Sequence, residues 1–349
     1  MSSFDEISSL PRFVVSDRDP LNANPWVARL PQFNERGEGA AVVEMLRAVM
    51  PTAERVQSMD LRDGIAAVRD LGIVCGSLKR HQIEPVEAVP ELEPILLLLG
   101  ERTDMIPRDT VFHYGAWNPR GALDRRFTDD PQELALKNAG RIAAPRLEEA
   151  VCELERLVDA PLDAPEFVET CSRAHDLLEA LITAITLARE EVTPVFFART
   201  LRPYFDAIRV RGRAYGGVSA VPLSVGLVDH LLWSSDNDDP TYRAFQNDTM
   251  EYNVPRMRRL YATRLGRPSL VTRLLALGPE ARATTYRASV EGVSALLKRL
   301  AAFRSPHANV AKAAYNAEIR KFPIGSGGYG VDTLTLILKL TADARKSLR

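Results

Sequence analysis

The sequence predicts an all-α protein, in which a bundle of long helices carries a smaller helical part at its N-terminal end. Apolar residues recur three and four positions apart over long stretches, whereas the alternating pattern typical of strands is scarce. Several of these stretches open with a proline close behind Asp or Ser, as at Asp130-Pro131 and Ser305-Pro306. The polar side chain can cap the first helical turn and proline presets its backbone φ, so each pair predicts a helix start.

In chain order, the periodic stretches predict helices over 40–50, 61–81, 131–158, 165–191, 222–235, 242–265, 279–304, 306–316 and 331–348. The stretch 165–191 carries one broad apolar stripe, formed by Phe167, Cys171, Ala174, Leu178, Leu181, Ile182 and Ile185. A stripe of that width is typical of a helix packed at the centre of a bundle. The polar, Pro- and Arg-rich segment 117–131 predicts a linker between a smaller part, 1–130, and a larger helical part, 131–349.

The composition narrows the class of protein. With 349 residues, 46% of them hydrophobic, the chain is long enough for a well-buried core. Lys and Arg total 45 and Asp and Glu 46, and this net charge of −1 gives no electrostatic reason to expect nucleic acid or a membrane as partner. The three cysteines lie far apart, so neither a disulfide framework nor a thiolate metal site is expected. No secretory signal or bilayer-spanning stretch is found, which favours a cytoplasmic protein.

The first candidate for chemistry is a histidine at the start of the stretch 306–316. Helical spacing places His307 on one face with Val310, Ala311, Ala314 and Tyr315. We therefore expect the imidazole to point inward, among small residues that leave room for a flat group. A lone inward histidine is usually a hydrogen-bonded core residue, and metal or haem ligation is the alternative.

The second candidate is the segment Ile324–Gly330, which has four glycines in six residues and directly precedes the last predicted helix. Glycine permits positive φ, so successive backbone N–H groups can turn toward one point. At a helix N-terminus such a loop attracts a carboxylate or phosphate, although a flexible connection fits the pattern equally well. A nucleotide loop is disfavoured, because no strand precedes the segment and no Gly-Lys-Ser/Thr follows it.

Two further segments contain residues suited to ligand binding. In the segment 193–204, Arg202 follows Phe197 by about one turn, and an arginine beside aromatic rings can clamp a carboxylate; a surface arginine is the alternative. The small residues of 215–222 indicate either a close-approach loop or an interhelical turn. Asp229 and His230, in the next predicted helix, form either an ion pair or separate polar core residues.

Taken in order, these motifs resemble the indoleamine and tryptophan 2,3-dioxygenase superfamily of histidine-ligated haem proteins. The motifs are Pro-x-x-Phe-x-x-x-Leu-Arg, Gly-Gly-x-Ser-Ala, Arg-Ser-x-His and Gly-Ser-Gly-Gly. Within that superfamily the sequence is most similar to the monodechloroaminopyrrolnitrin synthase family, whose enzyme rearranges 7-chlorotryptophan. The similar stretches are 76–81, 117–119, 201–204, 208–210, 230–234, 306–307 and 324–329. The resemblance implies an indoleamine 2,3-dioxygenase-like helical bundle.

The resemblance also implies a cofactor, haem b, and the residues that hold it. It makes His307 the proximal ligand of the iron, and Arg304, one turn earlier, the partner of a haem propionate. Gly325 and Gly328 belong to the loop that covers the haem edge in the related enzymes.

For the substrate, the resemblance implies an aromatic amino acid held on the distal side of the haem. Arg202 and Phe197 match the residues that hold the substrate region, and Gly327 matches a contact to its amino-acid part. Tyr315 and Ser326 match positions near the pocket with a catalytic role. The small residues of the distal loop match the place where bulk would collide with the indole: Gly217, Ser219 and Ala220. His113 is the candidate distal acid or base, with a structural histidine as the alternative.

The sequence differs from the indoleamine enzymes in two features that indicate its branch of the superfamily. Ala198 stands where the indoleamine enzymes carry a second phenylalanine, and the distance from His307 to the glycine loop is shorter than in those enzymes. Both favour a pyrrolnitrin-type oxygenase acting on L-tryptophan or a halogenated tryptophan with O₂ or H₂O₂. The alternatives are a peroxide-using tyrosine 3-hydroxylase and a non-catalytic haem sensor or carrier. The oligomeric state and the product stay open.

Overall fold

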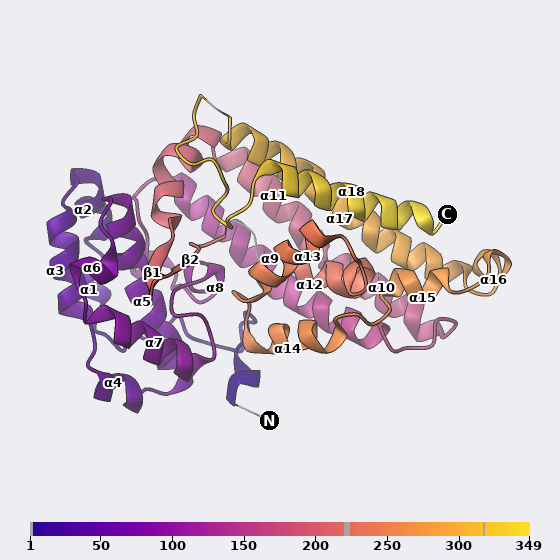
Figure 1. Cartoon of the computed structure of the whole chain (residues 1–349), viewed down its shortest axis with the longest axis horizontal. Coiled ribbons are helices and arrows are strands. Elements are labelled where there is room, and N and C mark those ends of the chain that lie inside the picture. Colours follow the sequence, from indigo (N-terminus) through magenta and orange to yellow (C-terminus); the bar gives the residue numbers. More distant parts are fainter. Residues whose placement is uncertain (1–2, 220–223, 317) are drawn as a thin grey trace.

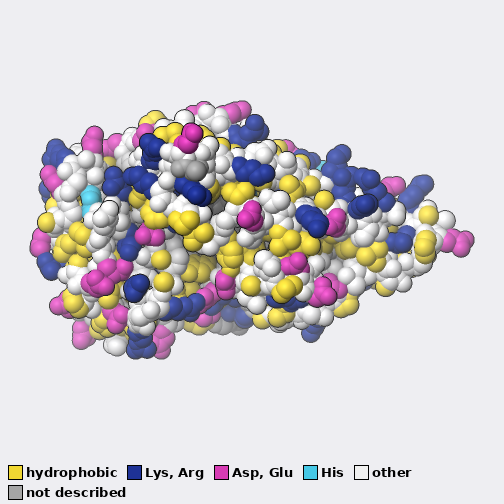
Figure 2. All heavy atoms as spheres, turned by 45° about the horizontal axis from the view of Figure 1, so that its top comes forward, with side chains coloured by type: hydrophobic (Ala, Val, Ile, Leu, Met, Phe, Trp, Pro, Cys, Tyr) yellow, Lys and Arg dark blue, Asp and Glu magenta, His cyan; other side chains and the backbone are white. Residues whose placement is uncertain are grey.

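The computed structural model describes residues 3–219, 224–316 and 318–349. It confirms the all-α fold: helices make up the architecture, and one short antiparallel hairpin is the only sheet among the described residues (Figure 1). None of the described helices is long and apolar enough to cross a membrane. On the face in Figure 2, basic and acidic side chains are interspersed rather than separated.

The N-terminal helices pack around one central helix. They are α1 (Asn24–Val27), α2 (Leu30–Arg36), α3 (Gly39–Val49), α4 (Ala53–Ser58), α5 (Leu61–Arg80), α6 (Pro85–Ala88), α7 (Leu92–Thr103) and α8 (Val111–Tyr114). Helix α5 is the central one: every residue from Gly64 to Leu78 is buried, and α3, α7 and α8 pack against it. Asp60 caps α5 by accepting a hydrogen bond from the Asp63 backbone N–H.

The long helices form the bundle that fills the other half of the molecule. They are α9 (Pro131–Leu157), α10 (Pro165–Leu177), α11 (Glu179–Glu191), α17 (Arg287–Ala314) and α18 (Val331–Ser347). Helices α10 and α11 pack on α9, and α17 packs on α10, α11 and α18 (Figure 1). Asp130 caps α9 through the Gln132 backbone N–H, with Pro131 in the first turn, as the sequence predicts.

Shorter elements connect these two groups. They are the hairpin β1 (Ile208–Val210) and β2 (Arg213–Tyr215), then α12 (Val225–Asp229), α13 (Pro240–Met250), α14 (Pro255–Arg264), α15 (Leu270–Leu275) and α16 (Pro279–Ala283). Among the described residues two π-helical turns occur, at Phe196–Leu201 and His230–Ser234, and 3₁₀ turns at Ser3–Glu6, Gly121–Leu123 and Arg202–Phe205. Strand β1 packs on α6 and α7, so this hairpin joins the C-terminal part to the N-terminal helices.

Four helix predictions are wrong in their boundaries, and one of them is 279–304, which divides into α16 and α17. The stretch 165–191 divides at Leu178 into α10 and α11, and 242–265 divides into α13 and α14, with Pro255 in the first turn of α14. Pro306 starts no helix but lies inside the 28-residue helix α17. Proline removes only one helical hydrogen bond, and buried residues on both sides, Phe303 and Ala308, keep the helix packed. The predicted helix 222–235 has its first two residues outside the described residues, and its helical part begins at Val225.

The segment 117–131 is not an exposed linker, contrary to its polar composition. Trp117, Arg125 and Phe127 are almost fully buried. The Trp117 indole N–H donates to the Ser8 carbonyl at 2.8 Å, and Arg125 donates to the buried carboxylate of Asp70 at 2.9 Å. Two charged residues of this segment, Asp124 and Arg125, are therefore paired in the interior, whereas Arg120 and Asp129 are exposed. The division of the chain at residue 130, where α9 begins, stays a prediction.

Candidate functional site

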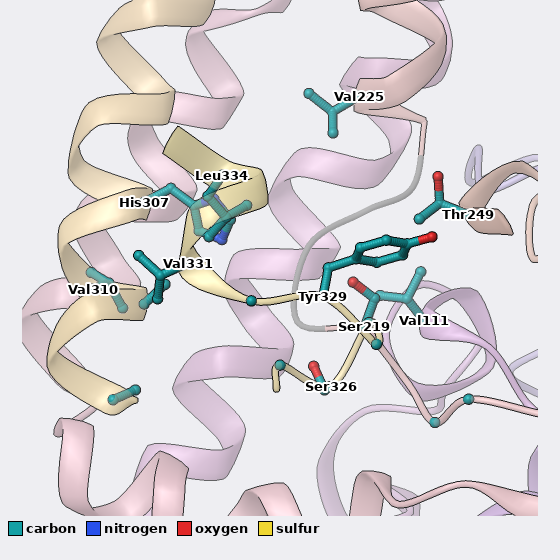
Figure 3. A pocket seen from close by; sticks show the side chains of 18 of the residues that line it. Val111, Ser219, Val225, Thr249, His307, Val310, Ser326, Tyr329, Val331 and Leu334 are labelled. Atoms are coloured by element: carbon teal, nitrogen blue, oxygen red, sulfur yellow. The ribbon is translucent and has the colours of Figure 1, made fainter. Parts of the chain in front are cut away.

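A cavity of about 680 Å³ lies between α17, the start of α18, α12, α13 and the segment 213–219. Its size falls within the range of cofactor and ligand sites, about 300–1,000 Å³. Most of the residues singled out by the sequence line it, including His307, Phe197, Tyr315 and the glycine loop 325–330. Figure 3 shows His307, Val310, Val331 and Leu334 grouped at one side of this cavity. The predicted inward face of α17 is confirmed, because all five of its members line the cavity.

His307 presents a neutral imidazole to the cavity. Burial, with a further contribution from the Arg304 cation, lowers the pKa of His307 to about 4. Among the described residues none forms a hydrogen bond with its ring nitrogens, and the nearest ring is Phe303, stacked at 5.4 Å and 8°. A neutral imidazole with available nitrogens is the form of histidine that ligates metal ions. The arrangement is the less common one for an inward histidine, which usually has a hydrogen-bond partner.

Arg304, one turn before His307, is paired with a carboxylate of the protein itself. It donates to Asp229 at the end of α12, and both side chains are buried and line the cavity. The same carboxylate accepts from the Tyr242 hydroxyl at 3.1 Å and from the Trp233 indole N–H at 3.0 Å. Arg304 Nε is buried without a partner among the described residues. The predicted propionate contact would therefore fall to that N–H, because Asp229 already neutralises the guanidinium.

Sequence reasoning left the partner of Asp229 open, and the structure assigns it to Arg304 rather than to the neighbouring His230. The His230 ring lies instead 3.1 Å from the Tyr261 carbonyl, and burial lowers its pKa to about 4. The π-helical turn that begins at His230 follows Asp229 directly. Such turns shift the side chains of a helix relative to its axis and are frequent at functional sites.

The glycine loop closes on itself at the cavity wall. Gly325 N–H donates to the Tyr329 carbonyl at 2.8 Å, and Gly328 N–H donates to the Gly325 carbonyl at 3.0 Å. Gly328 has a φ of 85°, which favours glycine at this position. Ser326 is buried and lines the cavity with Gly325, Gly327 and Gly328. The loop residues predicted for the site are thus brought together with His307.

Arg202 lies behind this loop and does not line the cavity. Its side chain is buried, its guanidinium stacks on the Phe322 ring at 4.1 Å, and Nη2 lies 3.5 Å from the Gly325 carbonyl. Nε and Nη1 have no hydrogen-bond partner among the described residues. A buried cation without a carboxylate partner is costly unless a ligand compensates it. Its neighbours Gly325 and Tyr315 do reach the cavity, so the predicted carboxylate clamp stays a prediction.

Comparison with known protein families shows to which family this chain is related. Residues 3–349 match the sequence model of the family described as monodechloroaminopyrrolnitrin synthase PrnB, which is essentially the whole chain. The chain belongs to the monodechloroaminopyrrolnitrin synthase family. The resemblance of the separate motifs is thereby confirmed, and the PrnB family is one of enzymes rather than of structural proteins.

In this PrnB-family chain, one glycine of the small-residue loop is required by packing within the protein. A side chain at Gly217 would place its Cβ 1.8 Å from the Phe205 carbonyl oxygen, so the backbones of the two segments touch. A side chain at Gly217 would therefore collide with the protein itself, and the collision with an indole that the resemblance implies stays a prediction. Gly217 and Ser219 line the cavity, whereas Ala220 lies outside the described residues.

We expect Gly217→Ala to lower the free energy of unfolding by about 1–3 kcal/mol, because the added methyl group must displace backbone atoms. Gly226→Ala is the matched control: Gly226 lines the same cavity, lies in α12, and has no atom within 4 Å of an added Cβ. Since alanine favours helix over glycine by about 1 kcal/mol, this control should be neutral or stabilising. Urea unfolding measures both, and equal stabilities of the two variants would contradict the close approach.

His113, the candidate distal acid or base, is placed outside the cavity wall. Its Nδ1 accepts a hydrogen bond from the Thr110 backbone N–H at 3.0 Å and so caps the short helix α8. The ring meets Trp117 edge-on at 4.8 Å, and burial lowers the pKa of His113 to about 3. Thr110 and Val111 reach the cavity from this helix instead. The catalytic role of His113 stays a prediction that the geometry does not favour.

The donor set of the cavity fits haem b and does not fit a metal bound by side chains alone. No cluster of three or more His, Cys, Asp or Glu suited to a metal ion occurs in the described part of the chain. Burial raises the pKa of Cys171 to about 12, so this thiol stays protonated. A single free imidazole is sufficient only where a macrocycle supplies the other ligands of the iron. His307, the unpartnered Arg304 Nε and the apolar wall beside them match that requirement.

Among the lining residues that sequence reasoning missed are Phe303, Asp248, Glu251 and Tyr329. Phe303 precedes His307 by four positions, so helical spacing could have placed it on the same face. Tyr329 lies within the glycine motif itself. Asp248 and Glu251 come from α13 and the turn after it, and no local pattern connects them with a histidine more than fifty positions away.

Proposed function

We propose that this chain is a haem b-dependent oxygenase that acts on L-tryptophan or a halogenated tryptophan and rearranges its indole ring in pyrrolnitrin-type synthesis. The observation that carries the proposal is the neutral, unbonded imidazole of His307 at the wall of a large cavity, in a chain that matches the PrnB family from residue 3 to 349. When bound, the haem would supply the redox chemistry that side chains lack.

For the haem, the chain contributes a ligand, a charge partner and an apolar wall. His307 would hold the iron through its neutral imidazole, and Phe303 packs against that ring. Arg304 offers one free N–H for a propionate, while Asp229 fixes the rest of its guanidinium. Leu334 and Ile337 of α18 add apolar side chains to this wall.

For the substrate, the glycine loop supplies the polar wall of the cavity. Ser326 and the backbone of Gly325–Gly328 face the cavity, and the unpaired Arg202 cation lies directly behind them. We assign the substrate's carboxylate to this wall, because Tyr315 lines the cavity there and lies close to Arg202. Phe197 offers a ring to the aromatic side chain. Such positioning can contribute up to about 7–11 kcal/mol to lowering a barrier.

The decisive experiment is a ligand titration of the haem-reconstituted protein by absorption spectroscopy. We expect a Soret band that shifts on addition of L-tryptophan or 7-chlorotryptophan and not of L-tyrosine. A tyrosine-induced shift with catechol product would support the tyrosine 3-hydroxylase instead. Gas binding without turnover of any aromatic amino acid, under O₂ with reductant or under peroxide, would support the sensor or carrier. A protein that binds no haem contradicts all three.

A further inference from the structure

Five charged side chains line the cavity in the described part of the chain, and four of them neutralise one another. Arg304 binds Asp229, and Arg213 binds Glu251. The fifth, Asp248 on α13, forms no ion pair with any described residue, although it is exposed and lines the same cavity. The cavity therefore carries one uncompensated negative charge, and that charge has a defined position.

Asp248 is held in place by the glycine loop. The Tyr329 hydroxyl donates to Asp248 Oδ2 at 2.5 Å, and the Tyr329 ring meets the Phe245 ring edge-on at 4.9 Å and 81°. Figure 3 shows Tyr329 reaching across the cavity toward Thr249, the residue next to Asp248. Phe245 precedes Asp248 by three positions on α13 and lines the cavity as well. The carboxylate thus lies beside two aromatic rings, with Oδ1 and the remaining lone pairs of Oδ2 available to a ligand.

A carboxylate next to aromatic rings is the chemistry that binds an organic ammonium group. An aromatic amino acid carries such a group at one end and its ring at the other. We propose that Asp248 accepts the ammonium group of the amino-acid substrate, with Tyr329 fixing the carboxylate. The inference rests on the proposed function and adds a residue that selects for the amino acid over its deaminated analogues. The glycine loop then lies near both charged groups of the amino acid. Arg202 lies behind the loop on the side of the carboxylate, and Tyr329 lies on the side of the ammonium group.

A purely mechanical role for the same contact makes a different prediction. If the Tyr329–Asp248 hydrogen bond only fastened the loop to α13, its loss would affect every ligand of the cavity alike, whatever charge the ligand carries. An ammonium acceptor affects only ligands that carry the ammonium group. Ligands with the same indole ring and different charged groups therefore separate the two roles.

The test measures dissociation constants of three ligands with the haem-reconstituted full chain: L-tryptophan, tryptamine, which lacks the carboxylate, and indole-3-propionate, which lacks the ammonium group. We expect Asp248→Asn to weaken tryptophan and tryptamine on the order of tenfold, because a charged hydrogen bond at an exposed position is lost. Indole-3-propionate should bind within about twofold of the wild-type value or more tightly, since a like charge is removed. Difference spectra or calorimetry give all three constants.

Tyr329→Phe is the matched control, because it removes the fastening hydrogen bond and leaves the Asp248 charge. We expect this variant to change all three constants by a similar factor and to keep the wild-type preference for ammonium-bearing ligands. If Asp248→Asn weakens the binding of all three ligands by a similar factor, the inference is overturned and the proposed function is unaffected. A wild-type holoprotein that binds none of the three overturns both. Circular dichroism of each variant verifies that the helical fold is intact.

Discussion

We expect the replacement of His307 with alanine to abolish haem binding, so that the reconstituted variant lacks a Soret band while its helical content stays unchanged. We expect the loss because the cavity offers one neutral imidazole and, in the described part of the chain, no cluster of other metal ligands that could replace it. Removing an outer-shell partner of a metal ligand costs about 10–100-fold in affinity, and removing the ligand itself should cost more. Haem titration followed at the Soret band measures the effect.

The matched control is His175→Ala. His175 lies on α10, contacts Asp176 and Arg299 near the surface, and does not line the cavity. This variant should bind haem as the wild-type protein does. Added free imidazole should restore a Soret band to His307→Ala, because the truncation leaves space for it beside Phe303. Unchanged haem affinity in His307→Ala would show that the ligand is a different residue.

The second large effect is expected when the buried carboxylate of Asp229 is removed, and it is a loss of stability. Asp229→Ala leaves the Arg304 cation, the Tyr242 hydroxyl and the Trp233 indole N–H without their common acceptor. Removing one partner of a buried ion pair costs about 3–5 kcal/mol, because the other charge is left uncompensated. We expect a loss of that size in the free energy of unfolding, measured by urea denaturation.

Two further variants test whether the loss of stability comes from the Arg304 cation, which Asp229→Ala leaves without its carboxylate partner. Asp159→Ala removes a carboxylate that pairs with Arg264 but is mostly exposed, and it should cost less than about 1 kcal/mol. The double variant Asp229→Ala with Arg304→Met should be more stable than the sum of its two single changes predicts, since the methionine removes the uncompensated cation. If Asp229→Ala lowers the free energy of unfolding no more than Asp159→Ala does, the hydrogen-bond network around Asp229 does not stabilise the fold.

The periodicity of the sequence predicts the long helices well where one face stays apolar throughout. The predicted stretches 61–81 and 131–158 correspond to α5 and α9 within one residue at each end. Periodicity could not reveal the break at Leu178, because the apolar stripe continues across it and neither glycine nor proline marks it. Proline was itself an ambiguous signal: Pro255 lies in the first turn of a helix, whereas Pro306 lies inside one.

The candidate site was predicted as far as its members share local motifs. His307, its neighbours on the α17 face and the glycine loop each belong to one short stretch, and the cavity brings the stretches together. The pairing of Arg304 with Asp229 joins residues 75 positions apart, and helical spacing carries no information on such a contact. For the same reason the sequence could not show that Arg202 lies behind the loop rather than in the cavity.

Pro306 has a consequence for how the proposed iron ligand is held. Its missing N–H leaves the carbonyl of Ala302 without a helical donor, and Ala302 is exposed, so water can satisfy that oxygen. A helix with one bond removed on its solvent side bends there easily. The point at which α17 can bend thus lies one residue before His307, so the imidazole could adjust its direction toward a bound haem while Phe303 and Ala308 keep their packing.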